Sequence, residues 1–127
     1  MKHAINPMQR VLMTSLWIAL VCAPATAQTL RCEVQSKQVC QPKSGCNPAP
    51  MAGFNKIDLD RRTFSRCDSL GCDDYQATFT TSGIFMNIDV VGRGLSAKLN
   101  ISDNSFLETA SMGDAVYVSF GKCQANP

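Results

Sequence analysis

Six cysteines follow a hydrophobic N-terminal segment in this chain of 127 residues, and they constrain its fold more than any other feature. They are Cys32, Cys40, Cys46, Cys67, Cys72 and Cys123. An even number of cysteines in a small exported domain is typical of a disulfide framework. Structural zinc sites draw instead on C-x-x-C pairs or on histidines, and the spacings here contain no such pair. We therefore predict three disulfides, although the spacing does not choose among the possible pairings.

The N-terminal segment has the three parts of an export signal. Lys2 and Arg10 supply positive charge, residues 11–23 are almost entirely apolar, and small residues follow up to Ala27. This pattern predicts a signal peptide over 1–27 and a single disulfide-rich domain over 28–127, in the periplasm or secreted. The apolar run is shorter than the roughly 20 residues that a membrane-spanning helix needs, which argues against stable membrane insertion. A lipoprotein signal acylated at Cys22 is the alternative, but Val21 stands where such signals carry a small residue.

Cleavage after Ala27 changes the charge and the chemistry of the protein. It removes Lys2 and Arg10 and no acid, which leaves 10 basic residues against 10 acidic ones. A neutral domain argues against binding to nucleic acid through a basic surface. Cleavage also removes His3, the one histidine of the chain, so the mature domain has no Ser-His-Asp or Cys-His site. We expect a protein that is not an enzyme and has no cofactor.

Alternating apolar and polar residues after the signal predict strands. The pattern recurs over 30–34, 54–59, 63–67, 75–80, 83–91, 95–101, 106–110 and 115–120. In three of these segments, apolar residues recur at every second position, which is the period of a strand with one buried face. The predicted inward residues are Ile84, Met86, Ile88, Val90, Leu95, Ala97, Leu99, Ile101, Val116, Val118 and Phe120. Residues 41–51, rich in proline and glycine, are predicted to form a loop.

About seven or eight short strands joined by tight turns predict an all-β fold, an antiparallel meander closed or nearly closed into a small barrel. Closure is favoured because it removes exposed strand edges. The first and last strands of such a barrel are neighbours, so a bridge from Cys123 to Cys32 or Cys40 is geometrically reasonable. The apolar residues available favour a filled interior over a hollow one.

Three aspartates, Asp68, Asp73 and Asp74, form the densest polar cluster. Their carboxylates suggest a weak calcium site or a carboxylate-dependent hydrolase. The spacing departs from the twelve-residue calcium loop, so a solvated turn held by Cys67 and Cys72 is the preferred interpretation. Arg61, Arg62 and Arg66 are either a contact patch for an acidic partner or, in the preferred interpretation, charges at turn and strand-edge positions. Glu108 lies on a strand whose alternation is ambiguous, so it either faces inward or, in the preferred interpretation, lines the solvent face.

The C-terminal half carries a family resemblance. Ser82-Gly83-Ile84-Phe85, the run 106–115 and the closing Cys123 resemble the periplasmic and membrane-bound inhibitors of C-type lysozymes. Those proteins are small exported β-barrels that insert a serine loop and a lysine-glycine loop into the acidic active-site cleft of the enzyme. The resemblance implies that Ser82 and Gly83 form the serine loop. Met112 stands in place of the lysine before Gly113, so the cationic contact is missing there.

The sequence therefore predicts an exported, non-catalytic binding protein that presents loops to a protein partner in the envelope or extracellular space. The candidate contact residues are Ser82, Gly83, Arg93, Met112 and Gly113. The alternatives are a calcium-binding or carboxylate-dependent hydrolase centred on the three aspartates, and a structural component of the envelope. The oligomeric state stays open.

Overall fold

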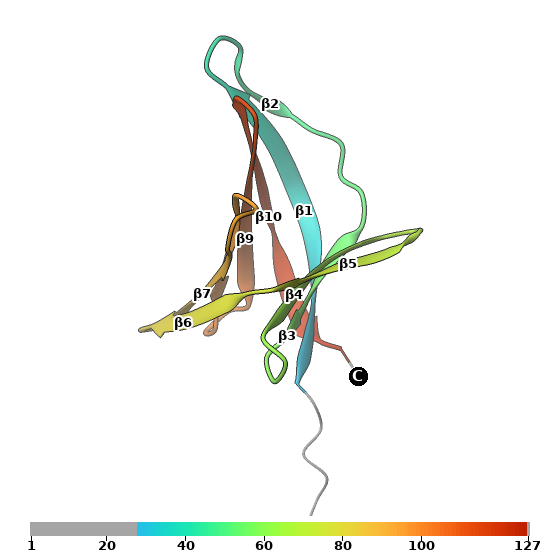
Figure 1. Cartoon of the computed structure of the whole chain (residues 1–127), viewed down its shortest axis with the longest axis vertical. Coiled ribbons are helices and arrows are strands. Elements are labelled where there is room, and N and C mark those ends of the chain that lie inside the picture. Colours follow the sequence, from blue (N-terminus) through green and yellow to red (C-terminus); the bar gives the residue numbers. More distant parts are fainter. Residues whose placement is uncertain (1–27, 127) are drawn as a thin grey trace, which may run out of the picture.

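The computed structural model describes residues 28–126, which fold into an all-β domain (Figure 1). The predicted signal peptide, including Cys22, lies outside these residues. No helix of membrane-spanning length and hydropathy occurs in this part of the chain. The ten strands are β1 (Thr29–Gln41), β2 (Gly45–Pro48), β3 (Phe54–Asp58), β4 (Thr63–Asp68), β5 (Gly71–Gln76), β6 (Thr78–Ser82), β7 (Phe85–Val90), β8 (Leu95–Asn100), β9 (Ser105–Met112) and β10 (Ala115–Ala125).

The strands form one antiparallel sheet that nearly closes into a barrel. Its order is β5-β4-β3-β1-β10-β9-β8-β7-β6, and β2 pairs with the far end of β1. The first and last strands are therefore neighbours, as predicted. The two ends of this order, β5 and β6, are separated in the chain only by Ala77, and they cross the molecule as one long run (Figure 1). This run pairs with β4 through its first half and with β7 through its second half. The prediction of a meander closed or nearly closed into a barrel is confirmed.

All three disulfides connect residues that lie directly opposite each other on paired strands. Cys32 of β1 pairs with Cys123 of β10, which are separated by 91 positions in the sequence. Cys40–Cys46 joins β1 to β2, and Cys67–Cys72 joins β4 to β5. The three predicted bridges are confirmed, and Cys32 is the partner of Cys123. Several disulfides are typical of proteins from oxidising environments outside the cytosol.

An apolar core fills much of the barrel. Its buried residues are Cys32, Ile57, Phe64, Ile88, Val90, Leu95, Ala97, Leu99, Phe106, Ala110 and Cys123. The rings of Phe64 and Phe106 stack with centroids 6.3 Å apart, which joins the two halves of the sheet. The alternation predicted for β8 is confirmed at Leu95, Ala97 and Leu99, whereas Ile84 and Ile101 lie in exposed turns instead of facing inward.

The prediction of which face of the last strand points inward is wrong. Val116 and Phe120 of β10 are exposed, and the buried positions are Ala115, Ser119 and Cys123. Gly121 explains why small residues face inward here. A Cβ at Gly121 would lie 2.0 Å from the carbonyl oxygen of Glu33, so β1 and β10 approach too closely for a side chain. The apolar residues of β10 consequently lie on the outer face of the barrel.

Two strands were not predicted, because their sequences lack the alternation of apolar and polar residues. β2 lies in the proline-rich segment 41–51, and β5 lies largely in the aspartate cluster. Each forms a short hairpin whose strands are joined by a disulfide, and their residues are almost all exposed. A strand with both faces in solvent carries no apolar alternation, so only the neighbouring cysteines marked these hairpins.

Asp103, in the turn between β8 and β9, gives a pH prediction. Hydrogen bonds from Ser105, followed by the charge of Lys122, hold the pKa of Asp103 below its ordinary value. A pKa that is lower in the folded than in the unfolded state contributes stability at neutral pH, and this contribution is lost as the pH falls through the folded-state pKa. We expect NMR titration to place the pKa of Asp103 below the ordinary value of an aspartate. A measured pKa of Asp103 at or above its ordinary value would contradict the contacts of its carboxylate with Ser105 and Lys122.

Candidate functional site

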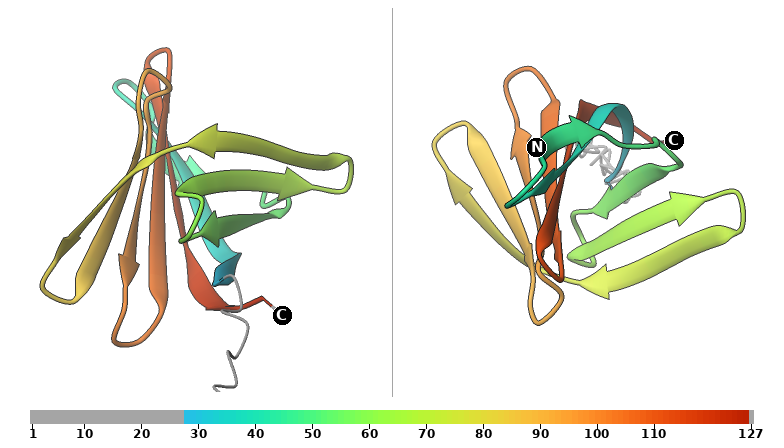
Figure 2. Two further views of the ribbon diagram at one scale, coloured as in Figure 1. Left: turned by 60° about the horizontal axis from the view of Figure 1, so that its bottom comes forward. Right: turned by 90° about the horizontal axis from the view of Figure 1, so that it is seen from above.

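The five predicted contact residues lie at opposite ends of the barrel. Ser82 and Gly83 are in the β6–β7 turn, and the amide of Ile101 donates a hydrogen bond of 2.8 Å to the carbonyl of Ile84, which joins this turn to the β8–β9 turn. Arg93 and Met112 are at the other end, where the amide of Ser111 donates to the carbonyl of Gly94 at 2.7 Å. Figure 2 shows the two sets of turns pointing away from each other. The five residues therefore form two separate surfaces.

The surface at the β6–β7 end continues into an apolar groove, called here the outer groove. Phe85, Leu107 and Phe120 line it on the outer face of β7 to β10, and its volume is about 190 Å³. Phe85 and Phe120 are 39% and 47% exposed, and the neighbouring turn residues Ile84 and Ile101 are 49% exposed. Clustered exposed apolar side chains of this size mark contact surfaces more often than scattered ones do.

Lys98 is the one charged side chain that lines the outer groove within residues 28–126. Its ammonium lies 5.4 Å from the ring centroid of Phe85, a cation–π distance. The outer groove therefore presents a positive charge beside aromatic surface, close to the β6–β7 turn. An acidic group next to apolar surface is the chemical complement of this arrangement.

The other end of the barrel has a different character. Met112 and Val91 are 61% and 83% exposed at the tips of two hairpins, and Arg93 lies 5.8 Å from the ring of Tyr75. Neither Arg93 nor Met112 lines the inner cavity or the outer groove described for residues 28–126. Exposed hairpin tips therefore characterise this end.

Two of the three aspartates, Asp68 and Asp73, line the same cavity, and Asp74 lies apart from them. Successive residues of a strand point to opposite faces, so Asp73 lines a cavity on the inner side of the sheet and Asp74 lines a depression on the outer side. Asp68 accepts a hydrogen bond of 2.7 Å from the amide of Leu70 and so stabilises the β4–β5 turn. Within residues 28–126, no three His, Cys, Asp or Glu side chains gather as metal ligands.

The cavity that Asp73 lines, called here the inner cavity, is a polar site that the sequence analysis did not predict. It has a volume of about 280 Å³ and is lined by residues of β1, β3, β4, β5, β9 and β10. Its floor is Glu108, which is 2% exposed, together with the buried Asn55 and Ser119. The prediction of a filled interior is therefore correct for the apolar core but incomplete for this region.

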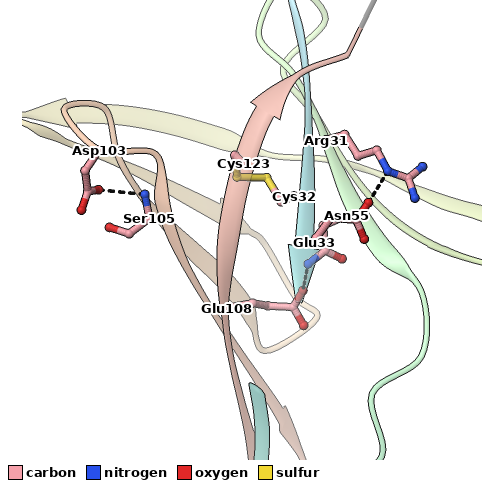
Figure 3. The surroundings of a disulfide bond; sticks show 8 residues. All are labelled: Arg31, Cys32, Glu33, Asn55, Asp103, Ser105, Glu108 and Cys123. Atoms are coloured by element: carbon pink, nitrogen blue, oxygen red, sulfur yellow. Dashed lines mark hydrogen bonds and ion pairs between the residues drawn. A yellow bond between two sulfur atoms is a disulfide. The ribbon is translucent and has the colours of Figure 1, made fainter. Parts of the chain in front are cut away.

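Glu108 is held by two partners on neighbouring strands. The side-chain amide of Asn55 donates a hydrogen bond of 2.7 Å from its Nδ2 to Oε2 of Glu108, as Figure 3 shows. Nη2 of Arg66 lies 3.5 Å from Oε1 of Glu108. Asn55 and Arg66 are paired across β3 and β4, so their side chains reach the cavity from the same face of the sheet. The preferred assignment of Glu108 to the solvent face is wrong, whereas the Arg66 side chain is still 36% exposed. The alternation Phe106, Glu108, Ala110 was the signal in the sequence, because both flanking apolar residues are buried.

Comparison of the chain with protein-family models, with curated proteins and with solved structures finds no match.

Proposed function

We propose that this protein is exported by the signal peptide over 1–27 to the periplasm or the extracellular space, where it acts as a non-catalytic binding protein. The observation that carries the proposal is the outer groove, in which exposed Phe85 and Phe120 flank Lys98 beside the turn of Ser82 and Gly83. Aromatic side chains at the centre of a contact supply much of its binding energy. The Cys32–Cys123 disulfide joins β10, one of the strands that present this surface, to β1.

The partner proposed is a protein with an acidic site, and a C-type lysozyme is the sharpest candidate. The resemblance at Ser82 and Gly83 motivates this choice. Lys98 supplies a cation on the same side of the barrel as those residues, whereas Met112 lies at the opposite end. A lysine flanked by aromatic surface is suited to a carboxylate in a partly apolar cleft.

Inhibition of a C-type lysozyme by the oxidised protein tests this proposal. We expect inhibition, and we expect Lys98→Met and Phe120→Ser each to weaken it about tenfold or more, because each removes a charge or an aromatic contact. Ser82→Ala tests whether the β6–β7 turn contributes to the inhibition. Lys43→Met, in the exposed turn between β1 and β2, is the matched control and should leave inhibition unchanged.

Two results would contradict this proposal in different ways. No inhibition by the oxidised wild-type protein would remove lysozyme as the partner. Inhibition that Arg93→Ser and Met112→Ser weaken, but Lys98→Met and Phe120→Ser do not, would place the contact at the opposite end of the barrel.

A further inference from the structure

The inner cavity brings together unpaired charges of both signs. Lys37 of β1 and Asp73 of β5 line it, and Arg66 of β4 lies between these two strands in the sheet order. Within the described chain, Lys37 forms no ion pair and has only the ring of Tyr117, 5.3 Å away, as a close partner for its ammonium. Asp73 likewise has no cation within ion-pair distance among residues 28–126.

Of the remaining charges at this site, Glu108 and Arg66 pair with each other, and Asp68 accepts a hydrogen bond from the amide of Leu70. Glu108 is neutralised by Arg66 and accepts from Asn55, so the buried carboxylate fixes the Arg66 guanidinium at the wall of the cavity. A guanidinium has five N–H donors, and the contact with Glu108 leaves most of them free. The cavity therefore presents free donors on Lys37 and Arg66, and carboxylates without a cation partner in the described chain on Asp73 and Asp68, of which Asp68 already accepts from the amide of Leu70.

We propose that the inner cavity binds a small zwitterion, an amino acid or a short peptide, with its ammonium at Asp73 and its carboxylate at Lys37 and Arg66. Such a ligand places its ammonium on the side of the cavity lined by Asp73 and Asp68, and its carboxylate beside Lys37 and Arg66. An uncharged ligand would shield Lys37 and Asp73 from water without replacing their solvation, which is unfavourable. The volume of about 280 Å³ is just below the roughly 300 Å³ at which pockets for drug-sized ligands begin, so it suits a ligand of this smaller size.

A carbohydrate fits the cavity less well. Phe54 is the one aromatic residue among the lining residues described here, and the guanidinium of Arg31 lies 3.3 Å from its ring centroid. One face of this ring is thus already covered. The segment leading into Phe54 is also fixed in place, because a Cβ at Gly53 would lie 1.7 Å from the carbonyl oxygen of Cys67.

Binding is tested by NMR titration of the oxidised domain with glycine, L-alanine and L-alanyl-L-alanine. The matched probes are N-acetyl-L-alanine, which lacks the ammonium, and L-alanine amide, which lacks the carboxylate. We expect amide shifts at Asp73 and Glu108 with at least one zwitterion, and about tenfold weaker binding of either blocked probe, which loses one charge-assisted contact. Saturating ligand should also raise the melting temperature by several degrees.

Variants separate the two ends of the ligand. Lys37→Met and Asp73→Asn should each weaken binding of the zwitterion about tenfold, and Asp73→Asn should remove the discrimination against N-acetyl-L-alanine. Asp74→Asn is the matched control, because this neighbouring aspartate faces the opposite side of the sheet. Equal binding of the zwitterion and N-acetyl-L-alanine by the wild-type protein, or no shift with any zwitterion, would overturn the proposal. The outer groove is not involved in either result.

Discussion

Replacing both Cys32 and Cys123 by alanine is expected to lower the free energy of unfolding by about 4 to 5 kcal/mol. The bridge closes a loop with a sequence separation of 91, and the loss of loop-closure entropy in the unfolded chain grows with loop length. Both cysteines are buried, so alanine avoids placing a hydroxyl in the core. Small domains are stable by only about 5 to 15 kcal/mol, so this variant should lose much of its stability. Denaturation in urea, followed by far-UV circular dichroism, measures the change.

The two local bridges provide the control. Cys40–Cys46 and Cys67–Cys72 have sequence separations of 6 and 5, for which the same entropy relation gives only about 2 kcal/mol. Removing Cys40–Cys46 by alanine replacement should therefore destabilise the domain less than half as much. Equal losses for the long and the short bridge would show that loop entropy does not govern the stability of this barrel.

Arg66→Met is expected to destabilise the domain by about 3 kcal/mol, more than Glu108→Gln does. Removing Arg66 leaves the buried Glu108 carboxylate with Asn55 as its hydrogen-bond partner, and an uncompensated buried charge is strongly destabilising. Glu108→Gln removes the buried charge itself, and the Arg66 side chain is 36% exposed and can turn to water. Its expected loss is about 1 kcal/mol, the value of a typical hydrogen bond. Equilibrium denaturation of the two variants gives both values.

The double variant, Arg66→Met with Glu108→Gln, tests whether the unpaired carboxylate of Glu108 causes this loss of stability. If the unpaired carboxylate causes the loss in Arg66→Met, then adding Glu108→Gln should recover most of it, because the charge that lacked a partner is gone. Simple addition of the two single losses would instead show that Arg66 stabilises the barrel through packing of its side chain. Asp73→Asn, on the exposed strand β5, should change the stability little in either background.

The barrel could be predicted from the sequence where one face of a strand is apolar and the other polar. Leu95, Ala97 and Leu99 alternate with polar residues and are buried as this pattern indicates. The same rule failed in β10, where Val116 and Phe120 are exposed. There the close approach of Gly121 to Glu33 decides which face is inside, and this contact joins residues far apart in the sequence.

The inner cavity could not be predicted for a related reason. Asn55, Arg66 and Glu108 come from three different strands. All three are polar, and the polar residues of a single strand are expected on the face that meets solvent. Only the closing of the sheet turns these positions inward together. Burial of a charged residue also depends on its partners, which local sequence does not reveal.

The cross-strand placement of the disulfides has a consequence for the order in which the native bridges become available. Each short hairpin carries both of its own cysteines, so Cys40–Cys46 and Cys67–Cys72 need only local chain. Cys32 is the first cysteine of the domain, and its native partner, Cys123, is the last. When the chain is made from its N-terminus, four other cysteines follow Cys32 before its native partner emerges. Once the two hairpin bridges have formed, these four cysteines are already paired, so Cys32 keeps Cys123 as its partner, and this last pairing aligns β1 with β10 and closes the barrel at the same step.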